Sequence, residues 1–365
     1  MSTTSSGRRK RRAGTPPEDS ENTKTTKTTS TTAYNRNFEQ KLIDYGVYPD
    51  GYEYPDGQLP AMPSNWDEIN ERLAQSRSSL SPSRFPESEF RSFKRADTTA
   101  SKEKPITRAV LPAIDGDIGD PKCVGGDYPF GNLAHLTDGT LASAKPDHFF
   151  GARPEQLNPK IRDELNKFII PSTQDSLPMA PNFFLEAKGP DGSPAVATRQ
   201  ACYDGALGAR GIQKLQSYNQ DEPVYDNNAY TITSTYLAGT LKLYTTHLTP
   251  PQESNGRPEY IMTQLKGWSM TSDPETFRKG ASAYRNARDW AKEQRDNFIK
   301  AANERRPEPQ SDAPSSEHEA TSEATAVPGD SDTLATSDGT ELQDAAQWSF
   351  AQTDNSDEAP PVSTK

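Results

Sequence analysis

Only the middle of this 365-residue sequence has the apolar periodicity that a folded core needs. Residues 1–33 are rich in Ser, Thr, Lys and Arg, and residues 307–365 are rich in Pro, Ser, Glu and Asp. Such segments cannot bury enough apolar surface to offset the conformational entropy lost on folding. We therefore expect a disordered basic tail over 1–33 and a disordered acidic tail over 304–365. Folding should be confined to the residues between them.

The net charge of −11 is a property of the C-terminal tail. Residues 307–365 contain 13 acidic residues and one basic residue, so the rest of the chain is close to neutral. A near-neutral body gives no general sign of nucleic-acid binding, but it allows a local basic cleft.

Five consecutive cations near the N-terminus form a separate feature: Arg8, Arg9, Lys10, Arg11 and Arg12. The run is typical of a nuclear-localisation signal or a polyanion-binding patch, and the alternative is a solvated charge run. The sequence has no apolar run of about 18 residues and no secretory leader, so we expect no membrane span and no secretion. Its 2 cysteines exclude a disulfide framework. We expect an intracellular protein, nuclear or else cytoplasmic.

The middle of the chain divides into an extension, 34–105, and a core, 106–303. In the extension we expect helices over 38–45 and 66–75, a surface loop over 76–104, and packing of the whole segment on the core. Proline, glycine and the apolar periods divide the core into strands and helices, which gives an α/β fold class. The expected elements are an extended segment 106–114, strands 148–150, 181–189, 230–237, 240–248 and 259–266, and helices 159–169, 194–217 and 274–303.

The segment 181–189 (PNFFLEAKG) shows the alternation of a strand. Side chains of a strand point to opposite faces in turn, so Glu186 and Lys188 should share one face with Phe184. The helix that follows is rich in Ala and Gly, although an interior glycine costs about 0.8–1 kcal/mol relative to alanine. We therefore expect this helix to lie close against the sheet.

Three charged residues could form a metal-dependent site. Asp147 precedes the strand 148–150, and Glu186 and Lys188 lie on the strand 181–189. Two carboxylates at a sheet edge suit Mg²⁺ or Mn²⁺, which prefer oxygen ligands and also accept substrate phosphates. A neighbouring lysine could orient or deprotonate a water, or stabilise charge on the phosphate. The alternatives are that Asp147 caps a turn, and that Glu186 and Lys188 form an ordinary ion pair.

The helix after the strand carries further polar side chains that could contact a substrate: Arg199, Gln200, Tyr203 and Arg210. The two arginines could bind phosphate or pair with carboxylates, and Tyr203 could belong to the core.

The pattern Pro146-Asp147 with Glu186-Ala187-Lys188 resembles the PD-(D/E)XK nuclease superfamily. The segments FGNLAHLTDG, AKPDHFFGARP, PNFFLEAKGP, RQACYDGALGAR, YDNNAYTITSTY and RNARDWAKEQRDNFIKAAN resemble a filamentous-fungal family, a domain of unknown function that is regarded as nuclease-like. This second resemblance covers most of residues 34–303.

The resemblance implies a restriction-endonuclease-like core, in which a mixed β-sheet is flanked by helices. Asp147 and Glu186 would be the metal ligands and Lys188 the catalytic lysine. Gln200 and Tyr203 are similar to a Gln and Tyr pair found after the lysine strand in some nucleases of the superfamily.

We therefore expect a metal-dependent nuclease that hydrolyses phosphodiester bonds of nucleic acid, with DNA as the first expectation. One alternative is a catalytically inactive module of the same fold that binds nucleic acid or protein in its cleft, with the tails contacting protein partners. Another is a structural interaction protein in which Glu186 and Lys188 form an ordinary surface ion pair. Geometry separates them: carboxylates of Asp147 and Glu186 within about 4–6 Å favour the enzyme, and a separation beyond about 10 Å excludes a shared ion.

Overall fold

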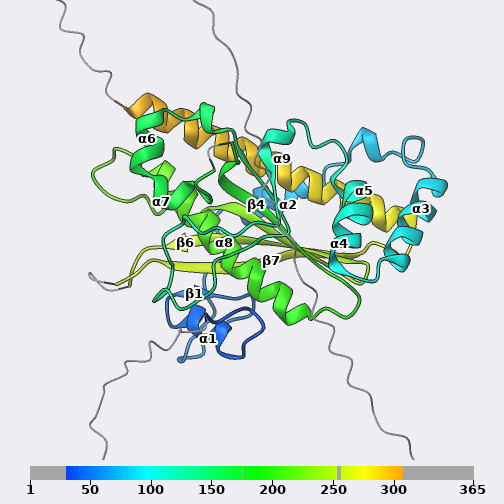
Figure 1. The fold of residues 1–365 in the computed structure, drawn as a ribbon, viewed down its shortest axis with the longest axis horizontal. Helices are drawn as coiled ribbons and strands as arrows, with labels where there is room; N and C mark the ends of the chain where they lie inside the picture. The colour runs from blue at the N-terminus through cyan, green and yellow to red at the C-terminus, as the bar shows by residue number, and fades with distance from the viewer. Residues whose placement is uncertain (1–29, 175, 253–255, 307–365) are drawn as a thin grey trace, which may run out of the picture. The chain divides into compact units, whose positions relative to one another are not determined.

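The computed structural model describes residues 30–174, 176–252 and 256–306. These residues form a seven-stranded mixed sheet with strand order β1-β7-β6-β5-β4-β3-β2 (Figure 1). Strands β4 and β5 are parallel, as are β1 and β7, and the other neighbours are antiparallel. The strands are β1 (Val47–Tyr48), β2 (Val124–Gly125), β3 (His148–Ala152), β4 (Met179–Lys188), β5 (Ala229–Leu237), β6 (Thr240–Thr249) and β7 (Glu259–Ser269).

Helices cover both faces of the sheet, which confirms the predicted mixed α/β architecture. Helix α8 packs on one face, and the long helix α9 packs on the other together with α2, α3 and α5 (Figure 1). The helices are α1 (Asn37–Ile43), α2 (Trp66–Ala74), α3 (Glu87–Thr99), α4 (Glu103–Pro105), α5 (Leu111–Asp115), α6 (Pro159–Glu164), α7 (Asn166–Ile169), α8 (Pro194–Gln216) and α9 (Pro274–Arg305).

Strand β4 alternates as its sequence predicts. Phe183, Leu185 and Ala187 are buried in the core beneath α9, whereas Phe184 is buried in the core beneath α8. Glu186 and Lys188 therefore belong to the α8 face of the sheet. The hairpin between β5 and β6 and the helices α8 and α9 also lie within a few residues of their predicted ranges.

Helix α8 lies close to the sheet because glycines face it. A Cβ atom on Gly208 would lie 2.7 Å from the Phe184 ring and 2.9 Å from the Pro181 carbonyl oxygen. Side-chain atoms do not approach other atoms so closely, and the backbone of β4 has little freedom to move away. The glycine therefore sets the distance between α8 and β4, as the Ala and Gly content of the helix predicts.

Replacing Gly208 with alanine should lower the free energy of unfolding by about 1–3 kcal/mol, because the new methyl group overpacks the interface. This loss exceeds the gain of about 1 kcal/mol in helix propensity. Urea unfolding followed by circular dichroism measures the change. Gly267→Ala in β7 is the matched control, since its Cβ would make an ordinary contact of 3.4 Å with Lys242. A Gly208→Ala protein as stable as the wild type would contradict this account of the packing.

The prediction of an extended segment over 106–114 is wrong. Residues 106–110 form one turn of π-helix, and α5 follows it directly. Ile106, Val110 and Ile114 are spaced four residues apart, and all three are buried, as one face of a helix requires. The helical run from 103 to 115 also crosses residue 105, where we placed the boundary between extension and core.

The prediction of a surface loop over 76–104 is also wrong, because this range contains α3. Phe90 and Phe93 of α3 pack on Phe277 of α9, with ring centroids 6.4 Å and 4.4 Å apart. Most charged residues of α3 lie on its outer face and hide this apolar stripe in the sequence, whereas Asp97 accepts a hydrogen bond from the buried Tyr236. The extension also adds β1 to the sheet, and the predicted helix 159–169 is divided at Leu165 into α6 and α7.

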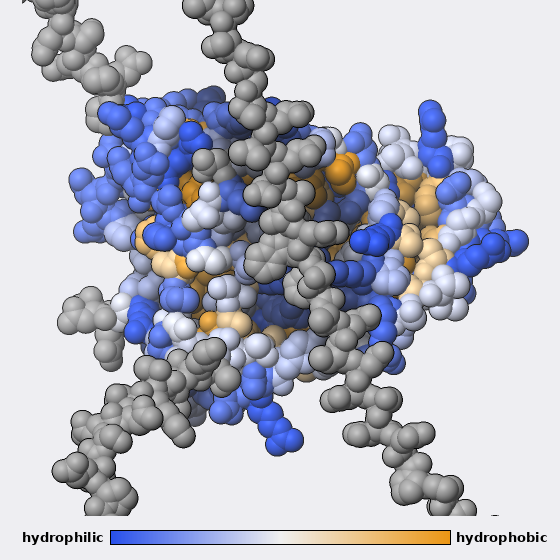
Figure 2. All heavy atoms as spheres, in the orientation of Figure 1, coloured by the Kyte–Doolittle hydropathy of each residue, from blue (hydrophilic) through white to orange (hydrophobic). Residues whose placement is uncertain are grey.

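The folded part includes the end of the predicted N-terminal tail. Thr31 forms a parallel bridge with Leu141, and Ala33 is buried. Residues 304–305, assigned to the C-terminal tail, are the last turn of α9. The cations of residues 8–12 and nearly all of the acidic tail lie outside the described residues. On the face shown in Figure 2, hydrophilic residues predominate and hydrophobic residues appear mainly in recesses.

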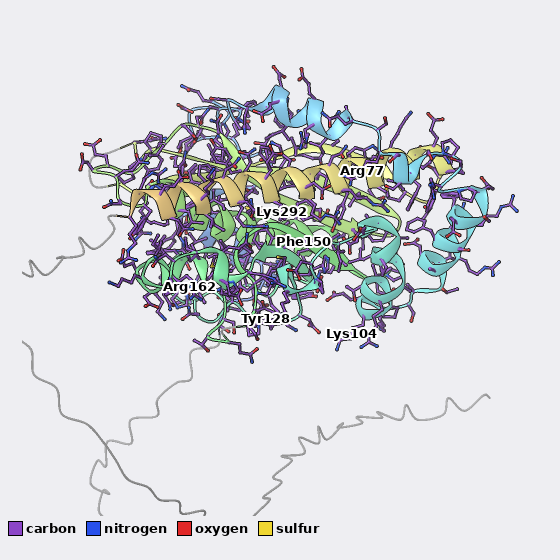
Figure 3. All side chains as sticks on the ribbon, turned by 90° about the horizontal axis from the view of Figure 1, so that it is seen from above. Arg77, Lys104, Tyr128, Phe150, Arg162 and Lys292 are labelled. Atoms are coloured by element: carbon purple, nitrogen blue, oxygen red, sulfur yellow. The ribbon has the colours of Figure 1, made fainter. Side chains whose placement is uncertain are left out.

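Helix α9 directs several of its arginines inward. Arg285 donates to the carbonyl oxygens of Ile114 and Ala113, and Arg288 donates to those of Asp115 and Asp117. Figure 3 shows Lys292 of α9 in the neighbourhood of Phe150. The basic residues of this helix thus include structural anchors for the 113–117 segment.

Candidate active site at the end of strand β4

Lys188 lies at the centre of a group of carboxylates. Its Nζ atom is 3.2 Å from Glu186 Oε2, 3.3 Å from Asp147 Oδ2 and 3.2 Å from Glu103 Oε2. The ammonium group also donates a hydrogen bond of 3.0 Å to the carbonyl oxygen of Ala187. Lys188 and Glu186 are both buried and Asp147 is largely buried, whereas Glu103 is partly exposed at the edge of the group.

The sheet positions two of these residues directly. Antiparallel pairing places His148 of β3 opposite Leu185 of β4, which brings the residue before β3 alongside the end of β4. Asp147 Oδ2 accepts a 2.8 Å hydrogen bond from the Ala187 N–H. This bond connects the start of β3 with the end of β4 and fixes the Asp147 carboxylate beside Lys188. Asp147 therefore does more than cap its own turn, which was the alternative considered for it.

Glu103 reaches the site from helix α4. A Cβ on Gly189, directly after β4, would lie 3.0 Å from the backbone of Lys102. Glycine at this position therefore lets the start of α4 approach the end of the strand.

The structure brings together the three residues predicted from the sequence. The carboxylate oxygens of Asp147 and Glu186 both lie within 3.3 Å of the Lys188 nitrogen, so their separation is far below the excluding distance of about 10 Å. A shared ion is therefore not excluded by the distance between the two carboxylates. The catalytic roles of the three residues stay predictions.

A fourth carboxylate, Asp204 of α8, lies within hydrogen-bond reach of Glu186 and lines the same cavity. Burial and the negative charges of Asp204 and Asp147 raise the pKa of Glu186 well above its ordinary value, and Lys188 partly opposes the shift. Burial, with the charge of Asp147, raises the pKa of Asp204 to about 7. For Lys188, burial alone would lower the pKa, but the charges of Glu186, Asp147 and Glu103 raise it. The ammonium group is therefore firmly protonated in this arrangement.

Glu103 and Asp204 were not predicted from the sequence. Asp204 carries a local signal, because it interrupts the Ala and Gly face of α8 four residues after Gln200, on the same side of the helix. Glu103 carries none, since it lies in a segment that reads as a polar loop and reaches the site only through tertiary packing.

Two of the predicted substrate residues lie near Glu186. Gln200 and Tyr203 line a cavity of about 170 Å³ together with Glu186 and Asp204. Tyr203 is buried and packs edge-on against Phe38 of α1, with ring centroids 5.8 Å apart. The tyrosine therefore belongs to the core, and Gln200 is the more accessible of the pair.

The two predicted arginines are engaged elsewhere. Arg199 pairs with Glu39 of α1 at 3.1 Å, which is the carboxylate alternative considered for it. Arg210 donates to the carbonyl oxygens of Ala134 and His135 and packs over the Phe168 ring. These contacts hold α1 and the 134–135 loop, and they give neither arginine a free guanidinium for phosphate.

The donor atoms suit a hard divalent cation. Carboxylate oxygens are the ligands that Mg²⁺ prefers, and Glu186 Oε1 is buried without a hydrogen-bond partner among the described residues. Within these residues no three His, Cys, Asp or Glu side chains are spaced as ligands of one ion. An ion bound by Asp147 and Glu186 would therefore need waters or substrate oxygens to complete its coordination, which is the usual situation for Mg²⁺.

Comparison of the chain with protein-family models, with curated proteins and with solved structures gave no match. Of the helices in the part that the structure describes, none is long and apolar enough to cross a membrane.

Proposed function

We propose that this chain is a metal-dependent nuclease that hydrolyses phosphodiester bonds of nucleic acid, with DNA as the first substrate to test. The proposal includes a restriction-endonuclease-like core, Asp147 and Glu186 as metal ligands, and Lys188 as the catalytic lysine. The observation that carries it is the convergence of Asp147, Glu186 and Lys188, which are distant in sequence, at the end of β4. The resemblance to the nuclease-like fungal family is part of the same proposal.

A bound Mg²⁺ or Mn²⁺ would neutralise charge on the phosphate and lower the pKa of a water. The protein's own contribution is to hold its carboxylates and one ammonium in fixed positions. The N–H of Ala187 orients Asp147, and the contacts of Lys188 with Glu186 orient the ammonium group. A fixed ammonium can stabilise negative charge that develops on a phosphate without reorganising during the reaction.

Exposed lysines near these carboxylates support an anionic substrate. Lys102 and Lys104 flank Glu103 in sequence and are exposed. Lys145 lies two residues before Asp147 and is exposed as well, although it pairs with Asp127 at 2.5 Å. Figure 3 shows Lys104 at the outer edge of the molecule, on the same side as Tyr128. Cations in this arrangement could contact the phosphates on either side of a scissile bond.

One observation favours the second candidate, a catalytically inactive module that binds nucleic acid or protein. The Lys188 ammonium already contacts Glu103, Asp147 and Glu186 at 3.2–3.3 Å. A lysine can thus take the place of a metal ion and keep buried carboxylates neutralised. The two candidates differ in whether a divalent cation can compete with the Lys188 ammonium for these carboxylates.

The test is incubation of the full chain with supercoiled plasmid and with single- and double-stranded DNA and RNA oligonucleotides, in Mg²⁺, Mn²⁺ or EDTA. We expect cleavage that EDTA abolishes and that Asp147→Asn and Glu186→Gln each reduce by about 100-fold or more. Arg199→Gln is the control, because Arg199 pairs with Glu39 away from Lys188. Equal cleavage by both site variants and the wild type would refute the mechanism. Binding of an oligonucleotide without cleavage under any condition would favour the inactive module.

A further inference from the structure

The carboxylates around Lys188 outnumber the cations that contact them. Among the described residues, Lys188 is the one cation in ion-pair contact with Glu103, Asp147 and Glu186, and Asp204 has no ion pair. Glu186 and Asp204 are each only 1% exposed. Burying unpaired charge is costly, so the cluster needs either protons on its carboxyl groups or positive charge beyond that of Lys188.

Three oxygen atoms beside this cluster have no hydrogen-bond partner within the described ranges. They are Glu186 Oε1, Asp204 Oδ2 and Gln200 Oε1, and all three are buried. The three residues line the same cavity of about 170 Å³. Glu186 and Asp204 lie within hydrogen-bond reach of each other, so a proton or a cation has to lie between them. Because buried acceptors are nearly always satisfied in folded proteins, the third oxygen, that of Gln200, favours a cation that all three can share.

The fold holds these oxygens in place from two elements. Gln200 and Asp204 are four residues apart on α8, so they lie on the same side of the helix. Glu186 comes from β4 and turns its other oxygen, Oε2, toward Lys188. Glycines in α8 let the helix lie close to the strand. Glu186 is therefore placed between Lys188 on one side and Asp204 on the other.

We propose that Glu186 Oε1, Asp204 Oδ2 and Gln200 Oε1 bind a hydrated divalent cation, Mg²⁺ or Mn²⁺, at a position separate from Asp147 and Lys188. Oxygen ligands with two negative charges match a hard cation. Mg²⁺ usually keeps several waters, and the cavity has room for them. The proposal extends the proposed function and rests on it only in sharing Glu186, since cation binding stands whether or not the chain cleaves nucleic acid.

The test measures Mn²⁺ binding to the full chain by electron paramagnetic resonance, together with thermal melting with and without Mn²⁺. The wild type should bind Mn²⁺ and melt several degrees higher in its presence. Asp204→Asn should weaken this binding by about tenfold or more and remove the rise in melting temperature. Asp67→Asn is the control and should leave both nearly unchanged, because Asp67 is an exposed carboxylate of α2 on the other face of the sheet. The acidic residues of 307–365 also attract Mn²⁺, so the quantity compared is the binding lost in each variant.

Asn has the shape of Asp and removes one buried negative charge, so Asp204→Asn should melt in EDTA at or above the wild-type temperature. Mn²⁺ binding that is absent in the wild type, or unchanged in both Asp204→Asn and Gln200→Leu, would overturn the proposal. If Asp204→Asn removes no further Mn²⁺ binding from an Asp147→Asn protein, the proposal is also overturned, because the two carboxylates would then share one ion. Mn²⁺ binding through Asp204 in a chain that cleaves nothing would refute the nuclease and leave this site standing.

Discussion

A Lys188→Met variant is expected to lose Mg²⁺-dependent cleavage by about 100-fold or more and to be about 3–5 kcal/mol less stable at neutral pH. Methionine keeps much of the volume of the lysine stem but removes the ammonium group that contacts three carboxylates. Glu186 would then be left buried without its counter-charge. Cleavage of plasmid and urea unfolding measure the two effects separately.

The loss of stability in this variant should depend on pH. Lys188 lowers the pKa of Glu186, so removing it raises that pKa further, and the pKa of Asp204 is already about 7. A carboxyl group whose pKa is higher in the folded state stays protonated to a higher pH there than in the unfolded chain. The free energy of unfolding is therefore highest at low pH. It falls as the pH rises from about 4, the pKa of a carboxyl group in unfolded chains, to 7 and above. Lys188→Met should lie closer to the wild type at pH 5 than at pH 8.

Lys188→Arg is the control for this prediction. Arginine keeps the positive charge, so most of the stability should remain and its pH dependence should stay that of the wild type. Its broader planar head group misplaces the charge for catalysis. A Lys188→Met protein that is equally destabilised at pH 5 and pH 8 would contradict the electrostatic account. Cleavage within tenfold of the wild type would contradict the catalytic role of Lys188.

The fold could be predicted where a regular spacing of apolar or small residues along the sequence coincides with burial of those residues. Strand β4 and helix α8 were predicted well, because the alternation of 183–188 and the small residues of α8 both reflect contacts with a sheet. Helix α3 was missed because charges cover most of its surface and its fully buried residues are only Phe90 and Phe93. The 106–114 segment was misassigned because a short apolar run fits a strand as well as a helix.

The site could be predicted in part. Asp147 lies directly before a recognisable strand, β3, and Glu186 and Lys188 lie at the end of another, β4. Pairing of the two strands then brings the three residues together. Glu103 depends on how α4 packs over the end of β4, and this packing leaves no pattern in the sequence. The partners of Arg199 and Arg210 likewise come from α1 and the 134–135 loop, which are far away along the chain. Long-range packing is the part of the site that local reasoning misses.

The second large effect is expected at Asn182, which supports a fully buried charge. Arg295 of α9 is 1% exposed, and its Nη1 donates to Asn182 Oδ1 at 2.8 Å and to the Phe150 carbonyl oxygen at 3.4 Å. The nearest carboxylate, that of Asp296, is 3.7 Å from Nε, beyond hydrogen-bond distance. Burial lowers the pKa of Arg295 to about 10, so the guanidinium still stays charged at neutral pH. Asn182→Leu should lower the free energy of unfolding by about 3–5 kcal/mol, because it removes the best partner of this charge.

A double-mutant cycle distinguishes this cause from simple loss of packing. Arg295→Met removes the charge while keeping an apolar stem, so it should cost less than Asn182→Leu. The double variant Asn182→Leu with Arg295→Met should be more stable than Asn182→Leu alone, since no charge is left stranded. Asn303→Leu is the matched control: Asn303 also hydrogen-bonds backbone groups, but it supports no buried charge and should cost only about 1 kcal/mol. If the double variant is instead the least stable of the set, the link between α9 and β4 depends on side-chain packing, and the Arg295 charge has no part in it.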